Sequence, residues 1–208
     1  NICTRSCGFC DVITGRPGYP DINEPARVAD TIAHLNLRHV VITSVDRDDL
    51  PDGGASIWAE TVERVREQSP DTSIEILVPD FKGDEEAFKE VFDSRPDILA
   101  HNLETVERLQ RSVRPQANYA RSLGVITAAK KAGLRTKSGL MLGLGEDVDE
   151  VVQAMSDLRD AGCDMLTLGQ YLRPSQKHLP VDRYVHPEEF QLLKKAGDDM
   201  GFIQVESG

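Results

Sequence analysis

The stretch HVVITSVDRDDLPDGGASIWAETVERVREQ, residues 39–68, shows the unit that decides the fold. Its first residues, 39–44, are rich in apolar and β-branched side chains, which is typical of a buried strand. Residues 54–68 instead carry apolar side chains at helical spacing, and the glycine pair at their start marks a turn. We therefore predict a strand, a polar turn and a helix in that order.

The same order repeats along the chain. The other expected strands cover residues 73–80, 97–102, 134–143, 164–169 and 202–207, and the other expected helices cover residues 84–94, 118–133, 147–162 and 186–201. Strand and helix in alternation predict a parallel sheet with right-handed crossovers, either doubly wound or closed into a full or partial barrel. Polar residues follow several strands, and a barrel places its chemistry at that rim, so we favour the barrel.

Composition limits the class of protein. With 208 residues, 39% of them hydrophobic, the chain is long enough for one core, and we expect a single domain over residues 1–208. The net charge is -11, which argues against binding to nucleic acid or to an anionic membrane surface. There is no apolar run of roughly 18 residues and no signal sequence, so we expect a cytoplasmic protein without a membrane partner.

Three of the four cysteines lie at the start of the chain: Cys3, Cys7 and Cys10 form the pattern C-x3-C-x2-C. A structural zinc ion usually takes four ligands in two pairs, and no second pair is visible, so zinc is an alternative only. Three thiolates suit a [4Fe–4S] cluster in which one iron stays free for a small-molecule ligand. A disulfide framework is disfavoured, and Cys163 is expected to be a buried apolar residue.

With Phe9 directly before the third cysteine, the loop resembles the signature of the radical SAM superfamily. The rest of the chain resembles the lipoyl synthase family within it, in the stretches CTRSCGFCDV, VVITSVDRDDLPDGGA, PDILAHNLETV, VRPQANY, TKSGLMLGLGE and GQYLRPSQKHLPV. The resemblance implies a partial (βα)6 TIM-like barrel, here with its first strand truncated. It also implies S-adenosylmethionine as cofactor, cleaved by an electron from the cluster to give a 5′-deoxyadenosyl radical.

The resemblance implies a reaction as well: insertion of sulfur at C6 and C8 of an octanoyl group on a lysine of a lipoyl domain or H-protein. A reducing electron-transfer protein would be a further partner. Family members carry a second [4Fe–4S] cluster as sulfur source, held by an upstream cysteine triplet and a downstream serine. Neither segment is among these 208 residues, so we expect the core of a longer chain that is incomplete for sulfur insertion. The alternatives are another radical SAM reaction or a noncatalytic Fe–S or zinc-binding module.

Candidate site residues follow the strands. The cysteines are the expected cluster ligands, with Phe9 beside them. The resemblance places Ser44 and Asp46 near the methionyl end of S-adenosylmethionine, although an acidic turn before a helix is the alternative. Asn102 and Glu104 suit the methionyl amine and the ribose hydroxyls, and a helix N-cap is the competing explanation for Asn102.

Two further pairs are candidates. Lys137 and Ser138 interrupt an apolar strand, and a charge there is costly unless it is paired or faces a polar interior. We expect Lys137 to point into the site, with a surface position as the alternative. Gln170 and Tyr171 end a strand and are expected to contact adenosine or substrate. Arg114 is expected either to bind an anion or to be a solvated loop residue.

Overall fold

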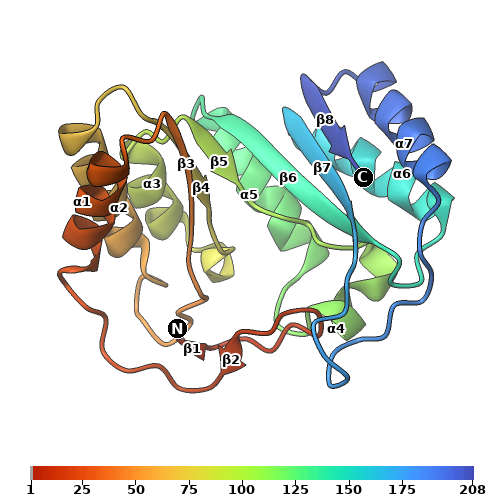
Figure 1. Ribbon diagram of the computed structural model, residues 1–208, viewed down its shortest axis with the longest axis horizontal. Helices are drawn as coiled ribbons and strands as arrows, with labels where there is room; N and C mark the ends of the chain where they lie inside the picture. The colour runs from red at the N-terminus through yellow and green to blue at the C-terminus, as the bar shows by residue number, and fades with distance from the viewer. Residues whose placement is uncertain (1) are drawn as a thin grey trace.

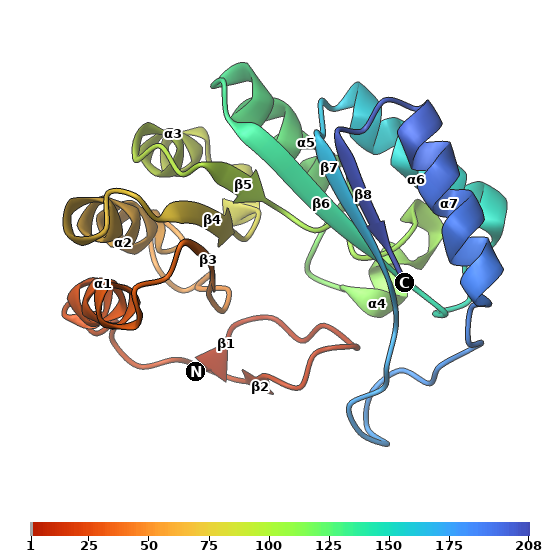
Figure 2. The same cartoon turned by 45° about the horizontal axis from the view of Figure 1, so that its top comes forward.

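One parallel sheet of six strands organises the structure, a computed structural model that describes residues 2–208. In chain order and in space the strands are β3 (His39–Thr43), β4 (Ser73–Leu77), β5 (Ile98–Ala100), β6 (Arg135–Leu142), β7 (Met165–Gln170) and β8 (Gln204–Ser207). Each strand pairs with the next, and β3 and β8 form the two edges. The sheet is therefore a curved, open barrel wall (Figure 2).

Helices cover the convex side of this wall (Figures 1 and 2). They are α1 (Glu24–Leu35), α2 (Ala55–Gln68), α3 (Glu85–Asp93), α5 (Tyr119–Lys131), α6 (Val148–Asp160) and α7 (Pro187–Asp199). Every predicted strand and helix is confirmed to within a few residues, and α1 is the one long helix that we did not predict. The sequential order of parallel strands with outer helices confirms the partial TIM-like barrel.

Side chains along the strands point alternately to the helix-covered face, which forms the core, and to the concave face. On β4, Ile74 and Ile76 are 0% exposed and pack with the helices, in a core that includes Val62 and Val65 of α2. Burying such a side chain stabilises the fold by roughly 1.5–3 kcal/mol. Glu75 lies between the two isoleucines and so points to the opposite, concave face.

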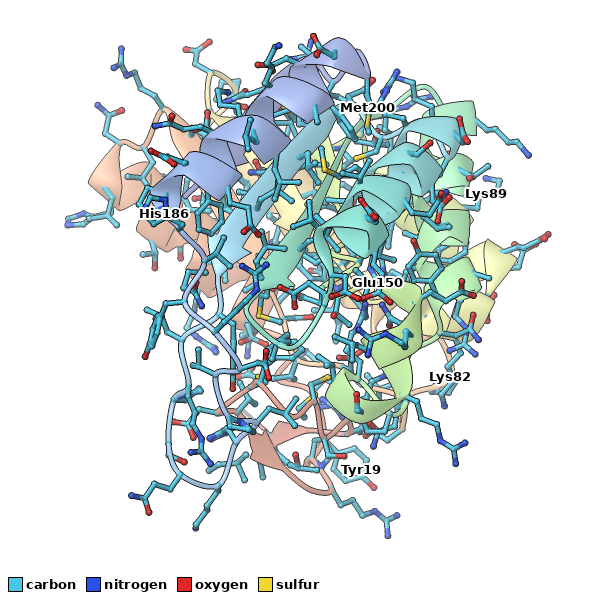
Figure 3. The ribbon with its side chains drawn as sticks, turned by 90° about the vertical axis from the view of Figure 1, so that its right-hand side faces the viewer. Tyr19, Lys82, Lys89, Glu150, His186 and Met200 are labelled. Carbon is cyan, nitrogen blue, oxygen red and sulfur yellow. The ribbon has the colours of Figure 1, made fainter. Side chains whose placement is uncertain are left out.

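The N-terminal segment crosses the open side of the wall. The two-residue strands β1 (Ile2–Cys3) and β2 (Ile13–Thr14) pair in parallel with each other, apart from the main sheet, and enclose the cysteine loop. Two short 3₁₀ helices, η1 (Phe81–Gly83) and η2 (Glu107–Leu109), and the short helix α4 (Gln110–Val113) follow β4 and β5 at the same end. Figure 3 shows Tyr19 of this segment and Met200, after α7, at opposite ends of the molecule. Within the described residues, no helix has the length and apolar character needed to span a bilayer.

Candidate active site

A cavity of about 220 Å³ opens at the C-terminal ends of β3, β4 and β5, beneath the cysteine loop. This is the rim at which we expected the chemistry. Its lining includes eight of the twelve predicted site residues: Cys3, Cys7, Phe9, Cys10, Ser44, Asp46, Asn102 and Glu104. The structure thus brings together residues that are up to about a hundred positions apart in the sequence.

Backbone contacts fix the cysteine loop over the cavity. The N–H of Thr4 donates to the carbonyl of Asp46 at 3.1 Å, and the N–H of Gly8 donates to the carbonyl of Val113 at 2.8 Å. Within the loop, the N–H of Cys10 donates to the carbonyl of Cys7 at 3.2 Å. The loop is therefore bound both to the end of β3 and to the end of α4.

Arg5 binds the cysteine loop to Asp48 and Asp80, a role that we did not predict. Its buried guanidinium donates to both carboxylate oxygens of Asp48, at 2.8 and 2.9 Å, and to Asp80 at 2.6 Å. A planar guanidinium suits such forked contacts. The sequence signal was an arginine between two cysteines, but its partners could not be identified without the fold.

The three cysteines are half-buried and free. Burial raises the pKa of Cys3 above its usual range and that of Cys7 to about 11, and the charge of Arg114 partly offsets the effect on Cys7. Among residues 2–208, no three His, Cys, Asp or Glu side chains gather tightly enough to hold one metal ion. A cluster is compatible with this spacing, because each thiolate would bind its own iron.

Asp46 lies between the cysteines and Arg5. Its Oδ2 is 3.8 Å from the sulfur of Cys3. Its Oδ1 is 3.2 Å from Nε of Arg5, but the N–H is not aimed at it, so this buried oxygen has no hydrogen bond. Burial raises the pKa of Asp46, and Arg5 opposes this shift. Ser44, by contrast, is exposed, and its hydroxyl donates to the carbonyl of Val45 at 3.0 Å.

Asn102 and Glu104 form a pair at the end of β5. The Asn102 amide donates to Glu104 Oε1 at 3.2 Å. Glu104 has a φ of 66°, which is uncommon for a residue with a Cβ, and hydrogen bonds to β6 hold it there. A Cβ on Gly139 of β6 would lie 3.0 Å from Asn102 Oδ1, so glycine leaves the room that this amide occupies. Asn102 precedes no helix, which excludes the N-cap explanation.

Arg114 also lines the cavity, although its side chain is buried. Its Nη1 donates to the backbone carbonyls of Asn102 and Leu103, at 3.0 and 2.9 Å. Within the described part of the chain, no carboxylate lies within ion-pair distance of Arg114. A buried guanidinium that no carboxylate contacts directly suits an anionic ligand, so its burial favours the anion-binding expectation over a solvated loop.

The other four predicted residues lie outside the cavity lining. Lys137 points to the concave face and bonds Glu75 at 2.8 Å. The Ser138 hydroxyl accepts the N–H of Leu103 at 3.2 Å. Gln170 and Tyr171 bind their own chain, the Tyr171 hydroxyl donating to the carbonyl of Leu179 at 2.8 Å. Their assignment to cofactor binding stays a prediction.

The donor set fits the group that the sequence implied. Three thiols, a carboxylate oxygen of Asp46 that accepts no hydrogen bond and the guanidinium of Arg114 share one cavity. Cys163 lies elsewhere, is 0% exposed, and belongs to the core beneath α6, as expected. No fourth cysteine competes with the loop.

Comparison with known proteins agrees with this arrangement. The model of the radical SAM superfamily matches residues 1–169. A lipoyl synthase of Rubrobacter xylanophilus is 57% identical over 210 residues, covering 100% of this chain and 65% of the relative. A mitochondrial lipoyl synthase of Nematostella vectensis is 54% identical over 209 residues, covering 100% of this chain and 72% of the relative. The chain thus spans 65–72% of the length of these two relatives.

Solved structures share the fold at low identity. Methylornithine synthase PylB superposes with a TM-score of 0.70 at 16% identity, over 99% of this chain and 68% of that protein. SuiB of Streptococcus suis superposes with a TM-score of 0.76 at 10% identity, over 99% of this chain and 46% of that protein. At such identities the likeness shows the barrel wall and nothing finer.

Proposed function

Since the chain belongs to the lipoyl synthase family of the radical SAM superfamily, we propose that it forms the radical-generating core of a lipoyl synthase. The reaction proposed is sulfur insertion at C6 and C8 of an octanoyl group on a protein lysine. The observation that carries the proposal is the convergence of Cys3, Cys7 and Cys10 with the buried groups of Asp46 and Arg114 on one cavity.

Each residue of the cavity has a proposed task. The three thiolates would hold a [4Fe–4S] cluster, which, with bound S-adenosylmethionine, supplies the 5′-deoxyadenosyl radical. Arg114 would bind the methionyl carboxylate, because its guanidinium lines the cavity and no carboxylate of the described residues is in direct contact with it. The Asn102–Glu104 pair would accept and orient hydroxyl or ammonium groups, for which its amide and carboxylate oxygens are suited.

The concave face offers a place for an acyl substrate below this cavity. Val41 of β3 is 53% exposed there, although it is apolar.

The partners proposed are octanoylated lipoyl domains or H-protein, a reducing electron-transfer protein and, in the full-length enzyme, a second cluster as sulfur source. A cytoplasmic location is part of the same proposal.

Cluster assembly tests the core of the proposal. After anaerobic reconstitution we expect close to four irons and four sulfides per chain, and release of 5′-deoxyadenosine from S-adenosylmethionine under reduction. Cys7→Ala should abolish this release, because two thiolates do not retain the cluster in this loop. The matched control is Cys163→Ala, which should leave the release nearly unchanged.

Two results would contradict the assignment of ligands. One is 5′-deoxyadenosine release that survives Cys7→Ala. The other is binding of one zinc ion without acid-labile sulfide in the unmodified chain, which would support the metal-binding module instead.

A further inference from the structure

A segment far along the chain closes the cysteine loop from outside. Residues 171–179, here called the strap, leave the end of β7 and pass beside the N-terminal loop (Figures 1 and 2). The N–H of Leu179 donates to the carbonyl of Gly8 at 3.0 Å, while the N–H of Gly8 is bound to Val113. Gly8 is therefore held between the strap and α4.

The strap also packs tightly against Gly8. A Cβ on Gly8 would lie 2.8 Å from both Cγ and Cδ1 of Leu179, closer than real Cβ contacts come. A side chain between Cys7 and Phe9 would therefore require the Leu179 side chain to move. The strap is in van der Waals contact with the loop that carries the cysteines.

His178 makes the contact nearest to a cysteine. Its Nε2 is 3.1 Å from the carbonyl oxygen of Cys10, and its Nδ1 is 2.9 Å from the Ser175 hydroxyl. A carbonyl oxygen can only accept, so Nε2 carries the hydrogen, and in the neutral ring Nδ1 then accepts from Ser175. Asp11 Oδ1 lies 3.6 Å from Nε2, beyond hydrogen-bond distance.

The strap orients this imidazole by its own bonds. The N–H of Lys177 donates to the Ser175 hydroxyl at 3.3 Å, and Arg173 Nε donates to the carbonyl of His178 at 2.9 Å. The buried Tyr171 hydroxyl donates to the carbonyl of Leu179 at 2.8 Å. Only 13% of the His178 side chain is exposed. The ring is therefore held in one orientation toward Cys10.

We propose that His178 is a positioning residue for the cluster: its Nε2–H holds the Cys10 carbonyl and so fixes the orientation of the third thiolate. The inference rests on the proposed function, in which Cys10 binds the cluster. Groups that hydrogen-bond a metal ligand typically change metal retention or activity by 10–100-fold when removed. The reduction potential of a cluster also depends on the hydrogen bonds and solvent exposure around it, so loss of the Nε2–H beside Cys10 should shift that potential.

The test compares variants of the reconstituted chain. His178→Ala should lose its cluster about 10- to 100-fold faster in excess chelator, followed by visible absorbance, and should have a shifted midpoint potential. His178→Gln should restore both properties toward the unmodified values, because its amide N–H reaches a position similar to Nε2. The matched control, His34→Ala, changes an exposed histidine of α1 and should alter neither.

A second variant tests the orientation of the ring. Ser175→Ala removes the hydroxyl that binds Nδ1 and helps to orient the ring, and it should change retention and potential in the same direction by less. If His178→Ala does not fold, Ser175→Ala decides the question, and unchanged retention and potential in that variant would overturn the proposal.

The outcomes separate this inference from the proposed function. A cluster that forms in the unmodified chain and is retained equally, at the same potential, by His178→Ala would overturn the role of His178 alone. A chain that assembles no cluster under any condition would overturn both proposals, since His178 would have no cluster to position.

Discussion

At the scale of single residues, His101 shows how the cavity wall keeps a titratable group neutral. The side chain is 3% exposed, and its Nδ1 lies 2.8 Å from the carbonyl oxygen of Val78. That oxygen accepts, so Nδ1 carries the hydrogen and Nε2 accepts from the Ser122 hydroxyl at 2.9 Å. Burial, and then the charge of Arg114, lower the pKa of His101 to about 4.

This shift predicts a loss of stability in mild acid. The folded chain takes up a proton on His101 only near pH 4, whereas the unfolded chain does so near pH 6.5. Above pH 6.5 His101 is neutral in both the folded and the unfolded chain, so the free energy of unfolding does not change. Below pH 6.5 the unfolded chain binds the proton more strongly, so the free energy of unfolding falls. By pH 5 the contribution to unfolding free energy is a loss of about 2 kcal/mol. Urea unfolding at pH 7 and pH 5 measures it.

Replacing His101 separates its contribution to the pH dependence of stability from that of other groups that titrate in acid. His101→Gln should reduce the difference between pH 7 and pH 5 by about 2 kcal/mol, while the exposed His34→Gln should leave it unchanged. If His101→Gln shows the same pH dependence as the unmodified chain, His101 is not the group responsible.

Whether a site residue could be predicted from the sequence depended on how far along the chain its partners lie. The cysteines, Asp46 and Glu104 could be found because short motifs and strand ends are visible in the sequence. Arg5 could not, because Asp48 and Asp80 are 43 and 75 residues away and become its neighbours only in the folded sheet. Lys137 was recognised as unusual, but its partner Glu75, 62 residues away, was not.

At the scale of elements, periodicity predicted the strands and helices that bury a clear apolar face. The helix α1 was not predicted, although its sequence carries the signals: Pro25, Ala29 and Ile32 are buried at helical spacing, and Asn23 and Pro25 stand at its start. The strands β1 and β2 have two residues each, too few to show an alternation. They are defined by their pairing with each other, Ile2 with Ile13 and Cys3 with Thr14.

The ion pair between Arg5 of the cysteine loop and Asp80, which follows β4, predicts that a small change at Asp80 lowers the stability of the fold. Asp80 is 0% exposed and accepts hydrogen bonds from Arg5 and, at 3.0 Å, from the N–H of Lys82. Asp80→Asn keeps the shape but leaves the buried Arg5 with less negative charge. We expect the unfolding free energy to fall by about 3 kcal/mol, measured by urea titration.

A matched substitution gives the control. Asp93→Asn removes the exposed partner of Lys89 on α3, and it should have no measurable effect on stability. Equal effects of Asp80→Asn and Asp93→Asn would show that the Arg5 junction does not support the loop.

At the scale of the whole molecule, three of the four thiols gather at one cavity of the open wall and the fourth is buried apart from it. The chain has four cysteines, and the one outside the loop, Cys163, is 0% exposed with its pKa raised by burial to about 12. A thiol so protected is a poor metal ligand, because the thiolate is the binding form. The described residues therefore gather one set of thiols, the set that the proposed radical chemistry uses.

This division predicts two separable activities. The reconstituted 208-residue chain should bind S-adenosylmethionine and release 5′-deoxyadenosine, yet form no lipoyl-lysine from an octanoyl-lysine peptide. Mass spectrometry of the peptide measures the second activity. A full-length family member should add two sulfur atoms in separate steps under the same conditions.

Either of two results would conflict with this view. Formation of lipoyl-lysine by the 208-residue chain alone would disprove the need for a second cluster. Failure of a full-length protein that contains this sequence to convert octanoyl-lysine would count against the proposed reaction.

The bond between His178 and Cys10 also orders events during synthesis. The two residues are 168 positions apart, so a ribosome must release almost the whole barrel wall before the strap can reach the cysteine loop. Contacts of such sequence separation form late, after local strands and helices have assembled. A nascent chain therefore exposes its three thiols before the segment that covers them has been made, and the strap can reach the cysteine loop only after some 168 further residues have been synthesised.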